Sequence, residues 1–318
     1  MESTINSQEI YKLSFKEKLR NFYHDQKGWI YILPILALMA VFTFYPLIRT
    51  TIYAFQNNYS SLDKSYNGWG FENFTYVLQY KKFQYCLANT ILFSVFAVPI
   101  STILALLISV GLNSIKWVQR AYQTIFFLPY LTNALAVGAV FATMFQIVGT
   151  GSVTFSYGLI NQIFHTKIDW LAVSPDNIWW NRIVVIVYEI WAGLPFKILI
   201  LFGALQNVNK QYYDAAKIDG TSRHRTLWKI TVPLISPMLS YLLITGFIGG
   251  FKAYTAVVGI FGAQTVERSY INTMVGYIYD NIGLGSTGVA AAGALILFVL
   301  ILFFTLINLY VSKKRVHY

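Results

Sequence analysis

Two ionisable side chains stand inside long apolar runs of the sequence. Glu189 lies in the run 183–205, which also contains Lys197, and Lys252 lies in the run 234–263. A charge at the centre of a bilayer costs roughly 2.5 to 3.5 kcal/mol on insertion scales, so each group needs a partner or water. Intramembrane charges either pair or mark a substrate pathway. Two hypotheses stay open: Glu189 and Lys252 neutralise each other or neighbouring residues, or they contact a ligand.

The other reactive residue types give no catalytic or metal-binding pattern. The single cysteine, Cys86, excludes an internal disulfide and a multi-cysteine metal site. The sequence lacks the Gly-x-x-x-x-Gly-Lys-Ser/Thr loop that cradles nucleotide phosphates. The four histidines are scattered, at His24, His165, His224 and His317. We therefore expect no catalytic residues, no metal site and no cofactor bound by this chain.

The composition is that of an integral membrane protein. Hydrophobic residues make up 56% of the chain and charged residues only 12%, whereas an average soluble domain has about 25% charged residues. Apolar runs of about 20 residues predict transmembrane helices. Six runs qualify: 29–48, 86–110, 121–148, 183–205, 234–263 and one ending near Val311. The predicted fold class is all-α integral membrane with six transmembrane helices, residues 29–311 forming the membrane domain and residues 312–318 a tail.

Lysine and arginine lie mainly on one side of the six predicted helices. With the N-terminus inside, the inner segments carry fifteen of them and the outer loops six. Because cytoplasmic loops retain positive charge, we expect both termini in the cytoplasm. The net charge of +11 then needs no nucleic acid to explain it. A basic patch for RNA is the alternative that a soluble chain would invite.

The first apolar run is expected to be a membrane anchor. It is too long for the hydrophobic region of a signal peptide and ends at Tyr45-Pro46 without a small-residue cleavage site. The cytoplasmic residues 1–28 ahead of it predict an amphipathic helix on the inner membrane surface. Its apolar residues fall at i, i+4, i+7 and i+8: Phe15, Leu19, Phe22 and Tyr23. A solvated basic tail is the alternative.

The segment 210–233 is polar and basic between two apolar runs. Its first arm has few helix breakers, Gly220 can take the left-handed conformation that ends a helix, and Thr221 or Ser222 can cap the next helix. Pro233 suits the first turn of the following span. These features predict two short helices with a bend, which favours a docking element. An ordinary connecting loop, kept basic for topology, is the alternative.

This segment resembles the cytoplasmic loop of ABC importer permeases. The family pattern is Glu-Ala-Ala, three residues, Gly, nine residues, then Ile-x-Leu-Pro. Here Asp214-Ala215-Ala216, Gly220 and Ile230-Thr231-Val232-Pro233 keep every spacing, with Asp for Glu and Val for Leu. The resemblance covers nearly the whole chain, including "FTFYPLIRTTIYAF", "QTIFFLPYL" and "WAGLPFKILILFGALQNV", and points to the carbohydrate-uptake, maltose-type larger-subunit branch. The chain departs from that subunit in lacking extra N-terminal spans and a large external insertion.

The resemblance implies a type I ABC importer permease in the bacterial inner or cytoplasmic membrane, surrounded by lipid. A second six-span permease would supply the other half of the pore, and an extracytoplasmic sugar-binding protein would touch outer loops such as 57–85 and 264–287. A cytoplasmic ATPase dimer, which holds ATP and Mg, would grip the 210–233 loop. The implied coupling residues are Tyr213, Asp214, Ala215, Ala216, Gly220 and Arg223.

The same resemblance places an oligosaccharide site in the fourth and fifth predicted spans. Sugars need polar groups that read hydroxyls and flat apolar faces for the rings. The candidate substrate residues are Tyr188, Glu189, Trp191, Gly193, Gly249, Gly250, Lys252 and Tyr254. Lys252 would meet a uronate carboxylate if the substrate is acidic, and the sequence leaves neutral and acidic sugars open.

Two other classes of protein remain as alternatives. An ion-coupled secondary sugar carrier would also place ionisable residues at mid-membrane, but such carriers usually show inverted repeats, and the sequence has no convincing repeat. A membrane-bound signalling or scaffold protein could share the six spans. Nothing in such a protein would require the loop spacing.

Overall fold

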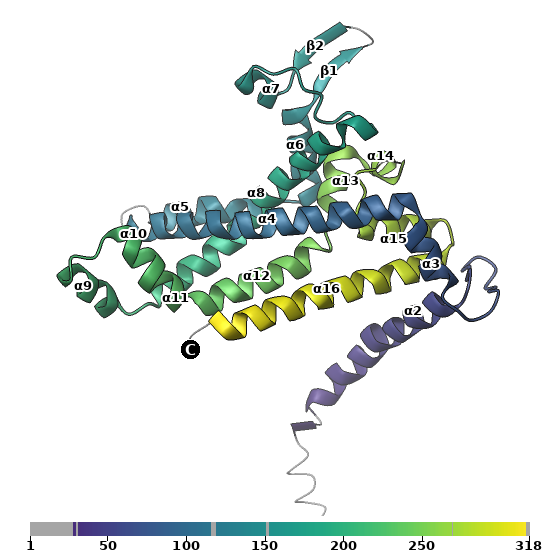
Figure 1. Cartoon of the computed structure of the whole chain (residues 1–318), viewed down its shortest axis with the longest axis horizontal. Helices are drawn as coiled ribbons and strands as arrows, with labels where there is room; N and C mark the ends of the chain where they lie inside the picture. Colours follow the sequence, from purple (N-terminus) through teal and green to yellow (C-terminus); the bar gives the residue numbers. More distant parts are fainter. Residues whose placement is uncertain (1–27, 30, 116–118, 151–152, 269, 316–318) are drawn as a thin grey trace, which may run out of the picture. The chain divides into compact units, whose positions relative to one another are not determined.

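The structure, a computed structural model, describes residues 28–29, 31–115, 119–150, 153–268 and 270–315 (Figure 1). The amphipathic helix predicted within residues 1–28 lies outside these residues except for Gly28. Two compact units divide after Ile52, namely Met1–Ile52 and Tyr53–Tyr318. In the first unit, the described chain is one helical stretch with a π-helical turn η1 (Ala40–Phe44) followed by α2 (Tyr45–Phe55). The predicted run 29–48 therefore continues as helix to Phe55, over 25 residues counted from Tyr31.

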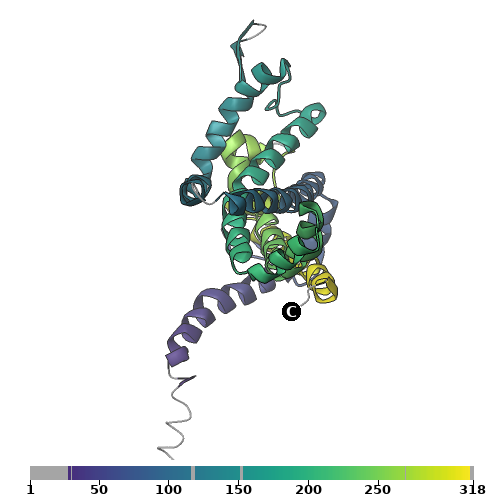
Figure 2. The ribbon, with the colours of Figure 1, turned by 90° about the vertical axis from the view of Figure 1, so that its left-hand side faces the viewer.

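Four helices form the main bundle of the second unit. They are α4 (Lys81–Ser114), α8 (Ile178–Gln206), α12 (Ser236–Gly250) and α16 (Thr287–Arg315). Helix α4 packs along α8 and α12, and α12 packs along α16 (Figures 1 and 2). Small residues in membrane helices let backbones approach closely. On α4 such a ridge recurs every fourth residue and is buried, at Ala97, Ser101, Ala105 and Ser109.

The third apolar run does not form one straight helix, contrary to the prediction. It is divided into α5 (Gln119–Phe127), a 3₁₀ turn η2 (Leu128–Leu131) and α6 (Ala134–Phe145), with a bend of 103°. Pro129 lies in the first turn of η2, and the Asn133 side chain caps α6 by accepting from the backbone N–H of Leu135 at 2.9 Å. A count of apolar residues does not detect these two helix-start signals.

The end of the third run is also not helical. Strands β1 (Ile147–Thr150) and β2 (Val153–Tyr157) form an antiparallel hairpin in which Ile147 pairs with Tyr157, and α7 (Leu159–Phe164) follows. This hairpin is an exception to the predicted all-α fold. β-branched and aromatic residues on both sides of glycines favour a hairpin over a helix.

The fifth apolar run is interrupted after Gly250. Helix α12 ends there, and the chain continues through α13 (Thr255–Phe261), α14 (Ala263–Arg268) and α15 (Met274–Gly283). Helix α13 packs on α6. A Cβ added to Gly138 would lie 2.7 Å from the Gly259 backbone, so the two helices touch through glycines. Two shorter helical elements of this unit are α3 (Glu72–Gln79) and the 3₁₀ turn η3 (Pro175–Asn177).

Between α8 and α12 lies the α9–α11 segment, residues 210–234, at the other end of the bundle (Figure 1). It contains α9 (Lys210–Ile218), α10 (Arg223–Thr226), a π-helical turn η4 (Leu227–Thr231) and α11 (Val232–Leu234). A bend of 70° then leads into α12. Pro233 lies in the first turn of the short helix α11, and Pro237 lies in the first turn of α12. Pro233 was predicted in the first turn of the following span; in the long helix α12, Pro237 takes that place.

Within the described residues, four helices are long and apolar enough to cross a membrane. The number of spans rises to six if each of the two bent helix pairs counts as one span. The straight candidates are Tyr31–Phe55, Lys81–Ser114, Pro175–Gln206 and Thr287–Lys313. The bent pairs are Thr124–Leu131 with Ala134–Phe145, and Arg223–Leu234 with Ser236–Gly250. The six predicted runs thus correspond to four straight helices and two broken ones.

Candidate functional site

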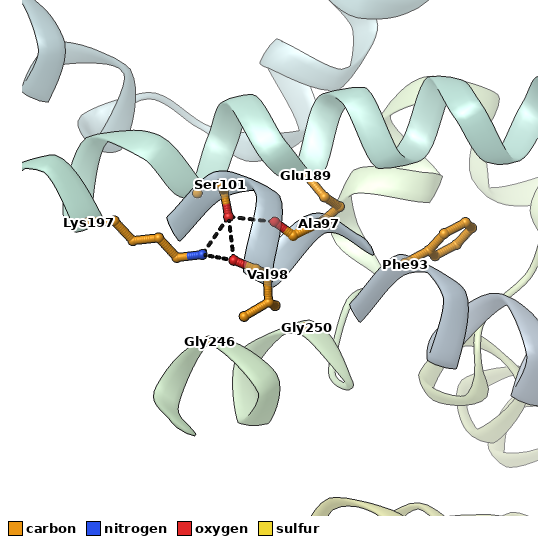
Figure 3. Close-up of a pocket in the computed structure, with 9 residues that line it drawn as sticks. Phe93, Ala97, Val98, Ser101, Glu189, Lys197, Gly246 and Gly250 are labelled. Carbon is orange, nitrogen blue, oxygen red and sulfur yellow. Dashed lines mark hydrogen bonds between the residues drawn. The ribbon is translucent and has the colours of Figure 1, made fainter. Parts of the chain in front are cut away.

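A polar cavity of about 110 Å³ lies where α4, α8 and α12 meet, and we call it the α4–α8 cavity (Figure 3). It is smaller than the roughly 300 to 1,000 Å³ of ordinary ligand pockets. All but one of its residues recur at every fourth position, which places them on one ridge of each helix, and the exception is Val98. They are Phe93, Ala97, Val98 and Ser101 of α4, Glu189, Gly193 and Lys197 of α8, and Gly246 and Gly250 of α12.

Lys197 is a buried cation of this cavity. Its side chain is 7% exposed, and its Nζ donates to the Val98 carbonyl oxygen at 3.1 Å and to the Ser101 hydroxyl (Figure 3). The Ser101 hydroxyl in turn lies within hydrogen-bonding distance of the Ala97 and Val98 carbonyl oxygens. A buried ammonium is tolerated only when such acceptors replace water. Lys197 therefore ties α8 to α4 at mid-helix.

Glycines of α8 and α12 lie close to this lysine and to α4. Hypothetical Cβ atoms on Gly193 and Gly246 would each lie 3.8 Å from the Lys197 Nζ, and one on Gly246 would also come within 2.8 Å of Val98 Cγ1. A Cβ on Gly250 would lie 3.0 Å from Ser94 Oγ. The close packing of α12 against α4 thus depends on missing side chains.

The structure corrects the suggested pairing of Glu189 with Lys252. Neither residue belongs to an ion pair among the described residues, and Lys252 is exposed just beyond the end of α12. Glu189 instead shares the cavity with Lys197. Lys197 was not among the predicted site residues. Its spacing was a usable signal, because Glu189, Gly193 and Lys197 fall at i, i+4 and i+8 and so lie on one ridge of a helix.

The other predicted substrate residues do not form one site. Tyr188 donates its hydroxyl to the Ala134 carbonyl oxygen at 3.0 Å and, like Trp191, packs its ring on Phe141 of α6. The Tyr254 ring lies 5.1 Å from that of Tyr279. Gly193 and Gly250 line the α4–α8 cavity, whereas Gly249 faces open space. Of the eight candidates, Glu189, Gly193 and Gly250 are brought together.

The α9–α11 segment has the predicted bend. Gly220 has φ +65°, its N–H donates to Lys217 O at 3.1 Å, and the Thr221 N–H donates to Ala216 O at 2.9 Å. These two bonds form a Schellman motif, which ends α9. Ser222 caps α10 by accepting from the Arg225 N–H at 3.4 Å. The sequence predicted both the glycine and the cap.

The predicted coupling residues surround grooves at this end of the bundle. A groove of about 800 Å³ lies between the end of α4 and the segment, and Tyr213, Ala216, Gly220 and Arg223 line it. A second, of about 650 Å³, is lined by Tyr213 and Asp214 among others. Asp214 pairs with Lys217 at 3.1 Å, but the side chains are 65% and 78% exposed. Ala215 is exposed and Ala216 buried, so one alanine of the pair faces the bundle.

Residues 88–317 match the family described as the binding-protein-dependent transport system inner membrane component. The chain belongs to this family. The match includes both the α4–α8 cavity and the α9–α11 segment. Among the described residues, no group of three His, Cys, Asp or Glu side chains could hold a metal ion.

Similar proteins include sugar permeases and a solved importer. The lactose transport system permease protein LacF of Rhizobium radiobacter is 26% identical over 92% of this chain and 96% of its own length. The arabinooligosaccharides transport system permease protein AraP of Halalkalibacterium halodurans is 27% identical over 96% and 95%. A bacterial alginate ABC transporter, solved with an alginate pentasaccharide-bound periplasmic protein, matches with a TM-score of 0.70 at 21% identity, over 93% of this chain and 96% of that one. That likeness supports the fold.

Proposed function

We propose that this chain is the membrane-spanning subunit of an ATP-driven oligosaccharide importer and forms half of its translocation pore. The observation that carries the proposal is the family match over residues 88–317, which contain both the cavity and the α9–α11 segment. The named systems of two relatives, for lactose and for arabinooligosaccharides, support a sugar as the substrate class. A second permease supplies the other half of the pore.

The α9–α11 segment couples this pore to a cytoplasmic ATPase dimer that binds ATP and Mg. The Schellman turn at Gly220 holds α9 and α10 at a fixed angle, and the grooves beside Tyr213, Asp214 and Arg223 leave space for a partner. The exposed Ala215 permits a close approach. Closure of the ATPase then moves α9 as a rigid element and switches the bundle between inward-facing and outward-facing states.

The proposed topology has six spans in a bacterial cytoplasmic membrane with both termini in the cytoplasm, counting each bent helix pair as one span. The excess of Lys and Arg on the α9–α11 side supports this orientation. The extracytoplasmic binding protein then meets the outer loops, which include 57–85 and 264–287. These loops lie at the opposite end of α4 from the α9–α11 segment (Figure 1).

The substrate passes beside the α4–α8 cavity. Glu189 and Lys197 supply the polar groups beside this pathway, and Lys252, just beyond the end of α12, is exposed. Of the aromatic candidates, Trp191 and Tyr254 are partly exposed and supply ring faces, whereas Tyr188 is buried and packs α8 against α6. Because the cavity is too small for a sugar ring in this conformation, the site opens only when α4, α8 and α12 separate.

The test is reconstitution of this chain with its second permease, the ATPase and the binding protein in proteoliposomes. We expect oligosaccharide uptake that requires ATP, the binding protein and both permeases, because one six-span half presents only half a cavity. Each component is omitted in turn as a control. Uptake by this chain alone, driven by a proton or sodium gradient, would instead establish the ion-coupled carrier.

A further inference from the structure

Arg182 is a buried cation without a carboxylate partner. It lies in the first turns of α8, its side chain is 7% exposed, and its Nε donates to the Asn89 Oδ1 at 2.9 Å. Neither terminal nitrogen of the guanidinium has an acceptor among the described residues. Removing one partner from a buried ion pair is strongly unfavourable, so a lone buried guanidinium is an unusual feature to retain.

The arrangement around Arg182 holds the guanidinium in place. Both N–H groups of the Asn89 amide are used, in bonds to the carbonyl oxygens of Tyr270 at 2.7 Å and Asn272 at 2.9 Å. The Asn89 oxygen must therefore face Arg182. The Arg182 Cζ also lies over the Trp179 ring, 4.7 Å from its centre. These contacts fix the plane of the cation but occupy only one of its three nitrogens.

The terminal nitrogens of the Arg182 guanidinium are not completely covered by the protein. The described nitrogen and oxygen atoms that are both buried and unbonded belong to Gln56, Asn57 and Tyr277, so the terminal nitrogens of Arg182 are not sealed inside the protein. Exposed aromatic rings lie nearby. Trp179 is 61% exposed. Tyr85 lies one helical turn before Asn89, and Tyr270 supplies a carbonyl oxygen to which Asn89 donates. The rings of these two tyrosines lie 4.8 Å apart, and both residues are exposed.

We propose that Arg182, with Trp179, Tyr85 and Tyr270, forms an anion-binding subsite that takes the carboxylate of an acidic oligosaccharide. The fork of N–H groups on a guanidinium matches the two oxygens of a carboxylate, and aromatic faces accept sugar rings. Arg182 and Glu189 lie seven residues apart on α8, so the subsite stands about 10 Å from the level of the α4–α8 cavity, at 1.5 Å rise per residue. This inference rests on the proposed function and narrows its substrate to uronate-containing sugars.

The test compares Arg182→Gln with Lys167→Gln, which removes a lysine from the exposed segment before α8. The assembled transporter is held in phosphatidylcholine nanodiscs and titrated calorimetrically with tri-galacturonate and with neutral maltotriose. Arg182→Gln should weaken tri-galacturonate binding roughly 10- to 100-fold, the value of a hydrogen-bonded charge, and leave maltotriose binding unchanged. Lys167→Gln should change neither. Wild-type protein that does not bind tri-galacturonate, or equal binding by Arg182→Gln, overturns the proposal.

The phosphate of a phospholipid is the other oxyanion that could bind at this place. A second experiment distinguishes this lipid from the sugar. If nanodiscs containing phosphatidylglycerol abolish tri-galacturonate binding, and native mass spectrometry finds that lipid retained by wild type but lost from Arg182→Gln, the occupant is lipid and the proposal is overturned. The same preparations are assayed for ATP-driven uptake of mixed neutral and acidic trisaccharides. Uptake of neutral sugars alone overturns only the acidic subsite, whereas absence of all uptake contradicts the proposed function.

Discussion

The α4–α8 cavity and the α9–α11 segment use charge in opposite ways. In the cavity, Lys197 is almost fully buried and bonded to α4. In the segment, Asp214 and Lys217 form an ion pair that is mostly exposed. Buried charges are expensive to unpair, whereas exposed pairs contribute about 0 to 1 kcal/mol. The cavity charges therefore hold the bundle together, and the charges of the segment remain available to a partner.

The largest expected effect on stability comes from Lys197→Met. It leaves the Glu189 carboxyl without its neighbouring cation and removes the two hydrogen bonds that tie α8 to α4. We therefore expect a loss of about 3 to 5 kcal/mol, the size expected when a buried charge loses the group that compensates it. Thermal unfolding of the purified chain in detergent measures it. The double variant Lys197→Met with Glu189→Gln should recover much of the loss. If the single variant is as stable as the wild type, the lysine has no structural role.

A smaller loss is expected from Gly138→Ala. The new Cβ would lie 2.7 Å from the Gly259 backbone, and α6 and α13 would have to separate. Overpacking of this kind costs typically about 1 to 3 kcal/mol. The matched control is Gly203→Ala in α8, where nothing lies within 4 Å and where alanine is the better helix former. Equal unfolding temperatures for both variants would mean that the glycine contact is not close-packed.

The smallest effect on stability is expected from Asp214→Lys. It breaks only the exposed pair with Lys217, so the free energy of unfolding should change by about 1 kcal/mol or less. Uptake by the reconstituted importer should nevertheless be abolished, because the reversed charge lies on the docking surface. An unfolding assay and an uptake assay on the same preparation check both halves. Normal uptake with normal stability would place the docking surface elsewhere.

The α9–α11 turn could be predicted from sequence because its determinants are local. Gly220 ends α9 through bonds within six residues, and Ser222 caps α10 within three. The identity of each residue directly restricts the backbone there. The bend between η2 and α6 also depends on local residues, Pro129 and Asn133. It was not predicted because a count of apolar residues takes no account of proline or of capping residues.

The cavity could be predicted only in part because its determinants are not local. Glu189 is recognised as a charge in an apolar run, and Gly193 follows from the family resemblance. The role of Lys197, in contrast, depends on Val98 and Ser101, nearly a hundred residues away on α4. Lys252 was suggested as a partner because it is also charged, but among the described residues the two form no ion pair. Hydrophobic patterning gives the helices, and side-chain contacts between helices decide which charges meet.

The central claim is that α9–α11 transmits ATPase motion to the pore, and Gly220→Val tests it most directly. Gly220 has open space around it but φ +65°, so valine would strain the turn without a clash. The measurement is ATP-driven, binding-protein-dependent uptake in proteoliposomes, with Gly203→Ala as the glycine control and co-purification of the ATPase as the assembly check. We predict that Gly220→Val inserts into the membrane but imports no sugar, while Gly203→Ala imports normally. Uptake by Gly220→Val at the wild-type rate would contradict the coupling role of the segment.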